Sequence, residues 1–375
     1  MDEKKKAPKL RFKGFTDDWK QRKIGELLLV NSGKDYKKLN KGNIPVYGTG
    51  GYMLSVDKAL SFYDAIGIGR KGTIDRPQYL RAPFWTVDTL FFMTSKKKND
   101  LKFLYALSQN INWKKYDEST GLPSLAKKTI SSILVKVPQD KEQKLIGRVI
   151  SQIDYVQNLQ QRKLEQLKLV KKALLQDLFT SKEASILRFK GFSGKWEKHK
   201  LGDFGTVAMN KRIFKNQTTE TGDIPFYKIG TFGKKADSFI SRKLFEQYKK
   251  RYPYPQKGDL LISASGSIGR IIEYKGEAAY YQDSNIVWLN HNNKLLNSFL
   301  KAYYQIIHWD GIEGSTIKRL YNKNILLTKI YLPTLKEQQE IGVLFKVIDE
   351  EIDLQQKRIS KLQTIKQFLL QNMFI

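Results

Sequence analysis

Two short patterns in the sequence resemble cofactor-binding or catalytic motifs. The first is the run Gly67-Ile-Gly69-Arg-Lys-Gly72, which has the GxGxxG spacing of dinucleotide-binding loops, with Asp88 at about the distance of a ribose ligand. No βαβ pattern surrounds it. When the two halves of the chain are aligned on Gly72 and Gly266, the second half keeps only the last glycine. A tight cationic loop explains these glycines equally well.

The second pattern is Asp259 followed by Glu273-Tyr-Lys275. Many metal-dependent nucleases use carboxylates to hold Mg²⁺ and a lysine to position the nucleophile. The matched positions in the first half of the chain hold different residue types, namely Ala65, Tyr79 and Arg81. A nuclease therefore remains an alternative interpretation.

The sequence offers few residues for other catalysis. It has no Cys and three widely spaced histidines, His199, His291 and His308, so no zinc site or Cys/His pair is expected. It lacks the Asn/Asp/Ser-Pro-Pro-Tyr/Phe motif of amino-methyltransferases and any acidic loop that would suggest S-adenosylmethionine binding. We expect no catalytic, cofactor-binding or metal-binding residues here, and we assign catalysis to partners.

The chain is strongly basic, with 375 residues and a net charge of +30. Because lysines and arginines are spread through the sequence, a polyanion is the expected partner, with nucleic acid ahead of a membrane surface. No apolar run reaches the length of about 18 residues that a membrane span needs, and no lipidation signal is present. Without a signal peptide or cysteines, the protein is expected to be cytoplasmic, with no membrane partner.

The strongest feature of the sequence is an internal repeat, which predicts the elements that position the residues described above. Residues 141–180 contain no proline and read as one long helix, and residues 336–375 repeat them at an offset of 195 positions. Every seventh residue forms the same seam in both copies: Ile146, Ile153, Gln160, Leu167 and Leu174, then Ile341, Ile348, Gln355, Leu362 and Leu369. About 40 residues at 1.5 Å each make a rod of roughly 60 Å, which is too long for an ordinary core and needs a partner helix.

The only polar seam residue lies at the midpoint of each helix. In an antiparallel coiled coil the midpoints meet, so Gln160 should face Gln355 and help to fix the register. Leu159 and Leu169 lie off the seam and indicate a further partner surface. The positions three residues after each seam residue are uneven, which predicts an imperfect coil: Val149, Val156, Lys163, Val170 and Asp177 against Leu344, Glu351, Arg358, Ile365 and Asn372.

Two similar globular blocks precede the helices, and each opens with LRFKGF. The expected organisation is a mobile N-terminus at residues 1–9, a first domain at 10–139, a first helix at 140–180, a linker at 181–186, a second domain at 187–335 and a second helix at 336–375. Between the similar frames, residues 28–83 and 205–279 differ and should be β-rich and dominated by loops.

Regular elements are expected at fixed places in each block. Strands are predicted within 84–93, 259–263 and 279–289, helices near 100–112 and 295–307, and closing strands at 133–137 and 325–332. The fold class is therefore α+β, with two pseudo-repeated α/β domains separated by two long helices that pair as an antiparallel coiled coil.

Several further motifs recur in both halves. They are the paired LRFKGF openings, the helix ends LLQDLF and LLQNMF, and the helix starts Pro138, Glu142-Gln143, Ile146-Gly147 and Pro333, Glu337-Gln338, Ile341-Gly342. With these motifs the chain resembles, over essentially its whole length, the specificity subunit of type I restriction-modification systems. The resemblance implies that two target-recognition domains each read one half of a split target in double-stranded DNA, while the helices set the spacing and dock two methyltransferase subunits.

The resemblance also implies a non-catalytic subunit. S-adenosylmethionine is then expected in the methyltransferase partner, and ATP and Mg²⁺ in a restriction partner; whether two restriction subunits also join stays open. The alternatives are a DNA nuclease, a self-sufficient DNA methyltransferase, or a basic coiled-coil scaffold without sequence preference. Turnover by the purified chain alone would favour an enzyme, and salt-sensitive binding without sequence preference would favour the scaffold.

The DNA-binding candidates are basic and polar residues in the variable loops, because base-edge contacts specify a sequence while phosphate contacts position the domain. For each of them a solvated surface residue is the alternative, and buried framework aromatics are favoured for the two tyrosines that follow Ile-Pro. The first domain offers Lys34, Tyr36, Lys37, Lys38, Tyr47, Arg70, Lys71 and Arg81, and the second Lys211, Arg212, Tyr227, Lys228, Lys234, Lys235, Ser265, Ser267, Arg270, Lys318 and Arg319.

Overall fold

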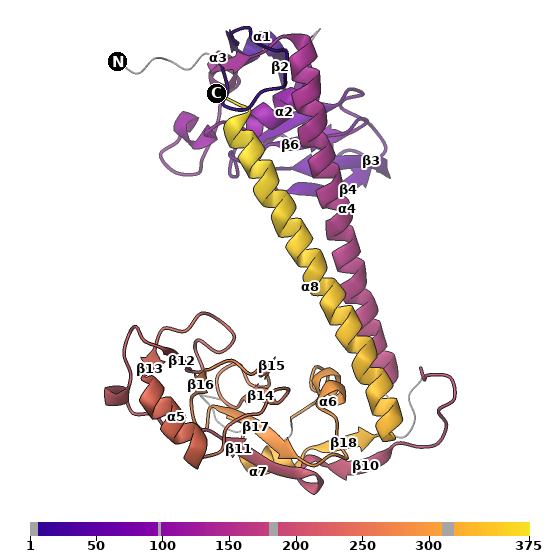
Figure 1. The fold of residues 1–375 in the computed structure, drawn as a ribbon. Helices are drawn as coiled ribbons and strands as arrows, with labels where there is room; N and C mark the ends of the chain where they lie inside the picture. Colours follow the sequence, from indigo (N-terminus) through magenta and orange to yellow (C-terminus); the bar gives the residue numbers. More distant parts are fainter. Residues whose placement is uncertain (1–6, 97–98, 180–186, 310–318) are drawn as a thin grey trace. The chain divides into compact units, whose positions relative to one another are not determined.

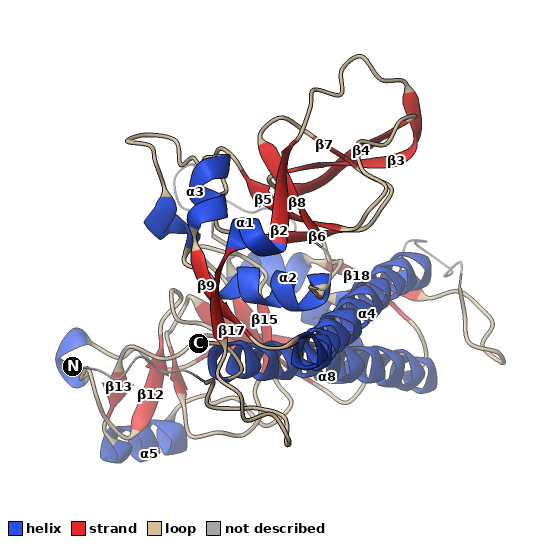
Figure 2. Cartoon of the chain, turned by 90° about the horizontal axis from the view of Figure 1, so that it is seen from above, coloured by secondary structure: helices blue, strands red, loops and turns tan. Residues whose placement is uncertain are grey.

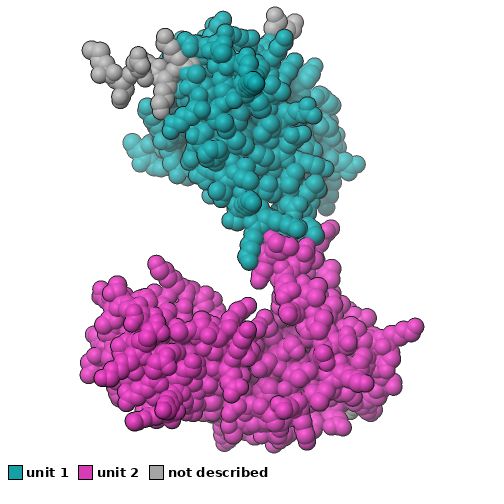
Figure 3. All heavy atoms as spheres, viewed as in Figure 1, with its two compact units in different colours: residues 1–163, 355–375 teal, residues 164–354 magenta. Residues whose placement is uncertain are grey.

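The computed structural model describes residues 7–96, 99–179, 187–309 and 319–375, which form both helices and strands (Figures 1 and 2). The chain forms two compact units (Figure 3): unit 1 contains residues 1–163 and 355–375, and unit 2 contains residues 164–354. Each unit therefore combines one globular block with a part of both long helices. None of the described helices is long and apolar enough to cross a membrane.

Unit 1 is built from three small sheets and short helices. Its largest sheet has the strand order β2-β8-β5-β6, the next has the order β4-β3-β7, and β1 pairs with β9. The helices are α1 (Ile24–Leu27), α2 (Leu101–Asn110) and α3 (Lys127–Ser132). The strands are β1 (Lys20–Lys23), β2 (Leu28–Ser32), β3 (Lys41–Gly48), β4 (Gly51–Val56), β5 (Ala65–Gly69), β6 (Gln78–Leu80), β7 (Trp85–Thr86), β8 (Leu90–Ser95) and β9 (Leu134–Val137).

Unit 2 repeats this topology. The order β11-β17-β14-β15 corresponds to the four-stranded sheet of unit 1, β13-β12-β16 to the three-stranded sheet, and β10-β18 to the pair β1-β9. Its strands are β10 (Glu197–Lys200), β11 (Gly205–Met209), β12 (Ile224–Tyr227), β13 (Phe239–Ile240), β14 (Leu260–Ser263), β15 (Ile271–Glu273), β16 (Tyr280–Tyr281), β17 (Ile286–His291) and β18 (Lys329–Leu332). The helices are α5 (Arg242–Arg251), α6 (Asn297–Tyr303) and α7 (Asn322–Leu327).

Most of the predicted elements are present, and two predictions need correction. Residues 325–332 do not form a single strand, because the first part of this stretch ends α7 and only β18 is extended. The variable segment 205–279 was predicted to contain strands and loops, yet it also contains the ten-residue helix α5. Ser241 caps this helix by accepting a hydrogen bond from the backbone N–H of Leu244 at 3.2 Å.

The two long helices are α4 (Asp140–Phe179) and α8 (Leu335–Asn372), and they run antiparallel, which confirms the predicted fold class. In unit 1 the N-terminal part of α4 lies beside the C-terminal part of α8, where Lys366 pairs with Asp154 at 2.5 Å. In unit 2 the roles are exchanged, and Lys171 pairs with Asp349 at 2.5 Å. The two ion pairs occupy equivalent positions in the repeat, so the same contact forms once in each unit.

The second row of buried side chains lies four residues after the seam positions, not three. Val156, Lys163 and Val170, which lie three residues after seam positions, are exposed. The buried set is Ile150, Leu164, Leu178, Phe345, Ile359 and Met373. A heptad repeat permits either offset, and the packing of the partner helix selects one of them. Val156, Lys163 and Val170 therefore lie outside the seam, whereas Leu344 is partly buried against the core of unit 2.

Each long helix ends inside a domain core. In unit 1, Phe374 stacks on Phe103 with ring centroids 5.4 Å apart and meets the edge of Trp19 at 6.2 Å. In unit 2, Phe179 lies against Trp196 at 6.0 Å and Phe299 at 5.7 Å. The C-terminal end of α8 thus completes the core of unit 1, and the end of α4 completes that of unit 2.

Candidate nucleic-acid interface

The repeated LRFKGF and Glu-Gln motifs form the same clamp in both units. Arg11 donates two hydrogen bonds to Glu142, at 2.7 and 2.9 Å, and Arg188 donates two to Glu337, at 2.7 and 2.8 Å. Both glutamates are fully buried. The hydrogen bonds to the carboxylates raise the pKa of both arginines, so both guanidinium groups stay charged. These repeated residues fasten the start of each domain to the start of a long helix.

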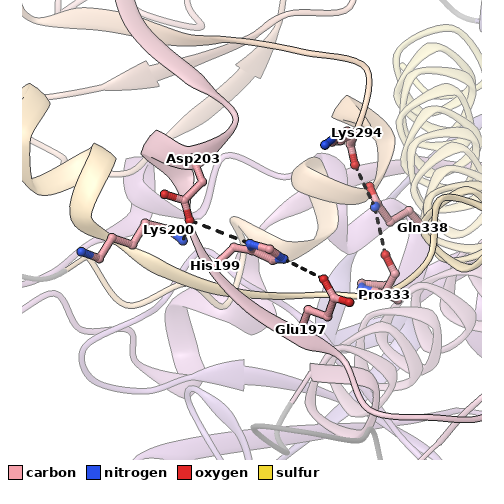
Figure 4. A network of polar contacts seen from close by, with 7 residues as sticks. All are labelled: Glu197, His199, Lys200, Asp203, Lys294, Pro333 and Gln338. Carbon is pink, nitrogen blue, oxygen red and sulfur yellow. Dashed lines mark hydrogen bonds and ion pairs between the residues drawn. The ribbon is translucent and has the colours of Figure 1, made fainter.

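The neighbouring glutamine and glycine complete this junction. In unit 2 the side-chain amide of Gln338 donates to the carbonyl oxygens of Pro333 at 3.1 Å and Lys294 at 3.2 Å (Figure 4). A Cβ on Gly342 would lie 2.4 Å from the hydroxyl oxygen of Ser298, so glycine is needed for α6 to approach α8. Gly147 has the same role in unit 1, because its Cβ would lie 2.6 Å from the backbone nitrogen of Phe103.

In unit 1 the candidate cations lie on loops at the edges of the sheets. Lys34, Lys37, Lys38, Lys71 and Arg81 are exposed, as is Arg70, whose guanidinium lies over the ring of Phe91 at 5.9 Å. Tyr36 is half-buried against the core cluster that contains Val46 and Phe84. It lines, together with Lys37, a hollow of about 590 Å³ beside the β3–β4 hairpin, whose other walls include Tyr52, Met53 and Asp88.

In unit 2 several candidates already have protein partners. Arg212 pairs with Asp283 at 2.9 Å, Lys228 pairs with Asp237 at 3.0 Å, and Lys211 lies over the ring of Tyr252 at 5.2 Å. By contrast, Lys234 and Lys235 are exposed in the turn between β12 and β13.

The last group of candidates surrounds the loop after β14. Ser265 is buried and donates to the side-chain oxygen of Asn285 at 2.8 Å, while Ser267 and Arg270 are exposed. Arg319 lies beside Ser265 in a β-bridge and donates to the hydroxyl of Ser284 at 3.0 Å. Lys318 lies outside the described residues, as does the predicted linker.

The two Ile-Pro tyrosines are half-buried. Tyr227 stacks on Tyr281 with ring centroids 5.7 Å apart, and Tyr47 meets the edge of Tyr52 at 6.5 Å. Burial raises the pKa of Tyr281, whose hydroxyl donates to Glu277 at 3.0 Å. Stacking within the protein accounts for Tyr227 as part of the framework.

The glycine-rich pattern does not open a helix. Gly67 and Gly69 lie in the fully buried strand β5, where a Cβ on Gly69 would come within 2.0 Å of the carbonyl oxygen of Thr73. Gly72 adopts a φ of +85° in the turn that follows, a conformation that glycine adopts at little cost. Close backbone packing at Gly69 and the positive φ of Gly72 therefore account for these two glycines without a dinucleotide, and a Cβ on Gly67 would press against the side chain of Leu80 at 3.1 Å.

The residues of the nuclease-like pattern also have local partners. Asp259 accepts a hydrogen bond from the backbone N–H of Gln256 at 2.7 Å, and Glu273 pairs with Lys301 at 2.7 Å. Within the described ranges, no group of three or more His, Asp or Glu side chains is arranged to hold a metal ion. His199 lies between Glu197 and Asp203 (Figure 4), at 3.1 and 3.8 Å.

The structure brings Gln160 and Gln355 together within unit 1. The side-chain amide of Gln355 donates to the backbone carbonyl of Gln160 at 3.0 Å and also to its side-chain oxygen. Gln355 is fully buried, and its own side-chain oxygen has no hydrogen-bond partner among the described residues. The role of this pair in fixing the register stays a prediction.

The pattern that defines the type I restriction modification DNA specificity domain matches residues 16–169 and 193–364, most of the chain and once in each half. The chain belongs to this family. A putative type I restriction enzyme specificity subunit from Haemophilus influenzae is 37% identical over 305 residues, which cover 80% of this chain and 78% of that protein. The MjaVIII specificity subunit from Methanocaldococcus jannaschii is 24% identical over 301 residues, covering 74% and 69% of the two chains.

A solved structure shares the fold of this specificity-family chain. The S subunit of a type I restriction-modification system from M. genitalium superposes with a TM-score of 0.75 at 17% identity, covering 98% of this chain and 99% of that one. Family and fold together identify a DNA-recognition protein of the specificity class.

Two exposed groups in the connections between sheets were not singled out from the sequence. In unit 2 the five basic residues of α5 are exposed. In unit 1 two aromatic residues that follow one another in the sequence, Phe62 and Tyr63, are 76% and 77% exposed. The signal that could have found α5 is the pairing of apolar Leu244, Phe245 and Tyr248, at helical spacing, with cations at most other positions.

Proposed function

We propose that this chain is the sequence-reading subunit of a type I restriction-modification complex, in which residues 10–139 and 187–335 each read one half of a bipartite DNA target. The observation that carries the proposal is the repeat: the same strand order, clamp and helix junction recur, while the loops between the strands differ. Two domains that recognise different base sequences from one scaffold need a shared frame and different loops. The loops make the base contacts that specify the sequence, and the frame positions those loops on the DNA. The candidate loop residues named above are proposed to make these contacts.

We assign the helices to the docking of methyltransferase subunits. In unit 1 the exposed apolar side chains include Leu159 on α4 and Ile365 on α8. Their counterparts in the repeat, Leu354 and Val170, are exposed in unit 2. Exposed apolar side chains on soluble helices often mark interfaces, and two equivalent sets would hold two methyltransferase subunits. S-adenosylmethionine then belongs to the methyltransferase partner, ATP and Mg²⁺ belong to a restriction partner, and this chain is non-catalytic.

The test of bipartite reading is an exchange of loops. Residues 34–83 are replaced by the matching segment of another family member, the protein is co-expressed with its methyltransferase, and the methylated motif is read by methylome sequencing. One half of the motif should change and the other should stay the same. If both halves changed, or if neither did while methylation continued, the assignment of one half to each domain would be wrong.

The test of docking is the mass of the co-expressed complex. We expect two methyltransferase subunits for each chain. Leu159→Glu should release one of them and Leu354→Glu the other, because each removes one of the two equivalent surfaces. A stable complex of the wild-type chain with a single methyltransferase would contradict this arrangement.

A further inference from the structure

The connection that joins the small sheet to the large sheet differs in chemistry between the two units. In unit 1 residues 57–64 join β4 to β5 and contain one basic and two acidic residues. In unit 2 residues 241–259 join β13 to β14 and contain six basic and two acidic residues, most of them on α5. Because the strands on either side correspond, these are the same connection with opposite net charge.

Helix α5 is anchored on one side and cationic on the other. Phe245 is buried in the cluster that contains Ile224 and Tyr280, with Leu244 and Tyr248 packed beside it. Figures 1 and 2 both show α5 beside β12 and β13. The basic residues Arg242, Lys243, Lys249, Lys250 and Arg251 are exposed.

Four of these cations have no partner in the part of the protein that the structure describes. Lys249 lies over the rings of Phe245 at 5.4 Å and Tyr254 at 5.1 Å. Arg242, Lys243, Lys250 and Arg251 form no ion pair or ring contact with any described residue. Their charges therefore remain available to a ligand.

Helix stability does not explain the first two cations. The positive end of the helix dipole lies at the N-terminus, where a cation costs on the order of 0.3–1 kcal/mol and a carboxylate would be favourable. Arg242 and Lys243 occupy this first turn, which contains no acidic residue. The basic residues of the last turn lie at the negative end of the helix dipole and stabilise the helix. The positions of Arg242 and Lys243 are not explained by helix stability.

We propose that α5 binds the phosphate backbone of duplex DNA and gives the second domain a sequence-independent hold that the first domain lacks. This inference rests on the proposed function. A ten-residue helix is about 15 Å long, and over that length of the duplex axis one DNA strand carries about four phosphates, at 3.4 Å of axial rise each. Lys211, a candidate DNA contact, lies over the ring of Tyr252 directly after α5 at 5.2 Å, so the helix extends that cationic surface.

The experiment compares two four-charge variants of the full chain. The α5 variant carries Arg242→Gln, Lys243→Gln, Lys250→Gln and Arg251→Gln. The control carries Lys198→Gln, Lys323→Gln, Lys329→Gln and Lys336→Gln, which are exposed on other elements of unit 2 and lower the net charge equally. Binding to a random-sequence duplex is measured at salt concentrations between about 50 and 200 mM.

We expect the α5 variant to lower the slope of log K against log salt by about two to four, and the affinity at about 0.1 M salt by about tenfold for each phosphate that is no longer neutralised. The control should change both far less. The methylated motif in cells that express the α5 variant with the methyltransferase should stay the same, since phosphate contacts carry no sequence information. The melting temperature should not fall.

Other results would overturn the inference. Equal effects of both variants would show a response to net charge alone. A changed motif would mean that α5 reads bases, and loss of methyltransferase binding with unchanged DNA affinity would mean that its ligand is an acidic protein surface. If the wild-type chain bound no duplex, the proposed function itself would be wrong. If the wild-type chain bound and the α5 variant bound equally well, only the inference about α5 would be wrong.

Discussion

The residues that most constrain each domain are the two arginine–glutamate clamps, not the loop cations. Removing one partner of a buried pair leaves the other charge without compensation, which typically costs about 3–5 kcal/mol. Because the side chain of Glu337 is 1% exposed, its carboxylate cannot be rehydrated without opening the junction.

We therefore predict that Arg188→Ala destabilises unit 2 by about 3 kcal/mol or more. Thermal unfolding, with amide exchange to locate the effect, measures this. Arg212→Ala is the matched control, because Arg212 forms a similar contact with Asp283 but is 61% exposed, and exposed pairs contribute about 1 kcal/mol or less. The paired change Arg188→Met with Glu337→Met should recover much of the stability, since an apolar pair leaves no buried charge. Equal effects of Arg188→Ala and Arg212→Ala would contradict the structural role.

At the scale of elements, the C-terminal end of α8 contributes to the core of unit 1. We predict that Phe374→Ala destabilises unit 1 by about 3–5 kcal/mol, the usual cost of emptying a buried aromatic site. Ile375→Ala is the control, because the neighbouring Ile375 is 41% exposed. Amide exchange should speed up around Trp19 and Phe103 and stay unchanged around Trp196. A uniform change in both units, or none, would count against this packing.

The long helices were identifiable from the sequence because their seams recur residue for residue. Repetition alone did not identify every element, because the repeated Ile-Pro runs, which lie in β3 and β12, were not predicted as strands. Helix α5 has no counterpart in unit 1, so its ten residues read as a charged loop. The buried row four residues after the seam could not be chosen over the row three residues after it, because that choice depends on the partner helix.

The candidate site was less predictable than the fold. The positions of the loop cations in the sequence did not reveal that Arg212 pairs with Asp283, 71 residues further along the chain, or that Lys228 pairs with Asp237 within the connection between β12 and β13. Similarly, Ser265 read as a polar loop residue, although it is buried and bonded to Asn285. Long-range pairing of this kind arises only when the sheets assemble.

At the scale of the whole molecule, the proposed function makes the helix pair a ruler between half-sites. Inserting one heptad at matched points in both helices keeps the seam continuous and adds about 10 Å of helix. The unread spacer of the methylated motif should lengthen by up to about three base pairs, at roughly 3.4 Å each. Methylome sequencing reads the outcome, and an unchanged spacer with full methylation would contradict a ruler.

The path of the chain through unit 1 bears on its synthesis. This unit begins with the first residues and is closed by the last, because the backbone N–H of Leu10 donates to the carbonyl of Asn372 at 2.8 Å and Phe374 fills the core. All of unit 2, residues 164–354, is translated in between. At a translation rate of about 5–20 residues per second, the site that Phe374 fills in the first domain stays empty for roughly 10 to 40 s. A ribosome that stops early therefore releases a chain whose first domain is unfinished and whose exposed apolar core proteases can recognise.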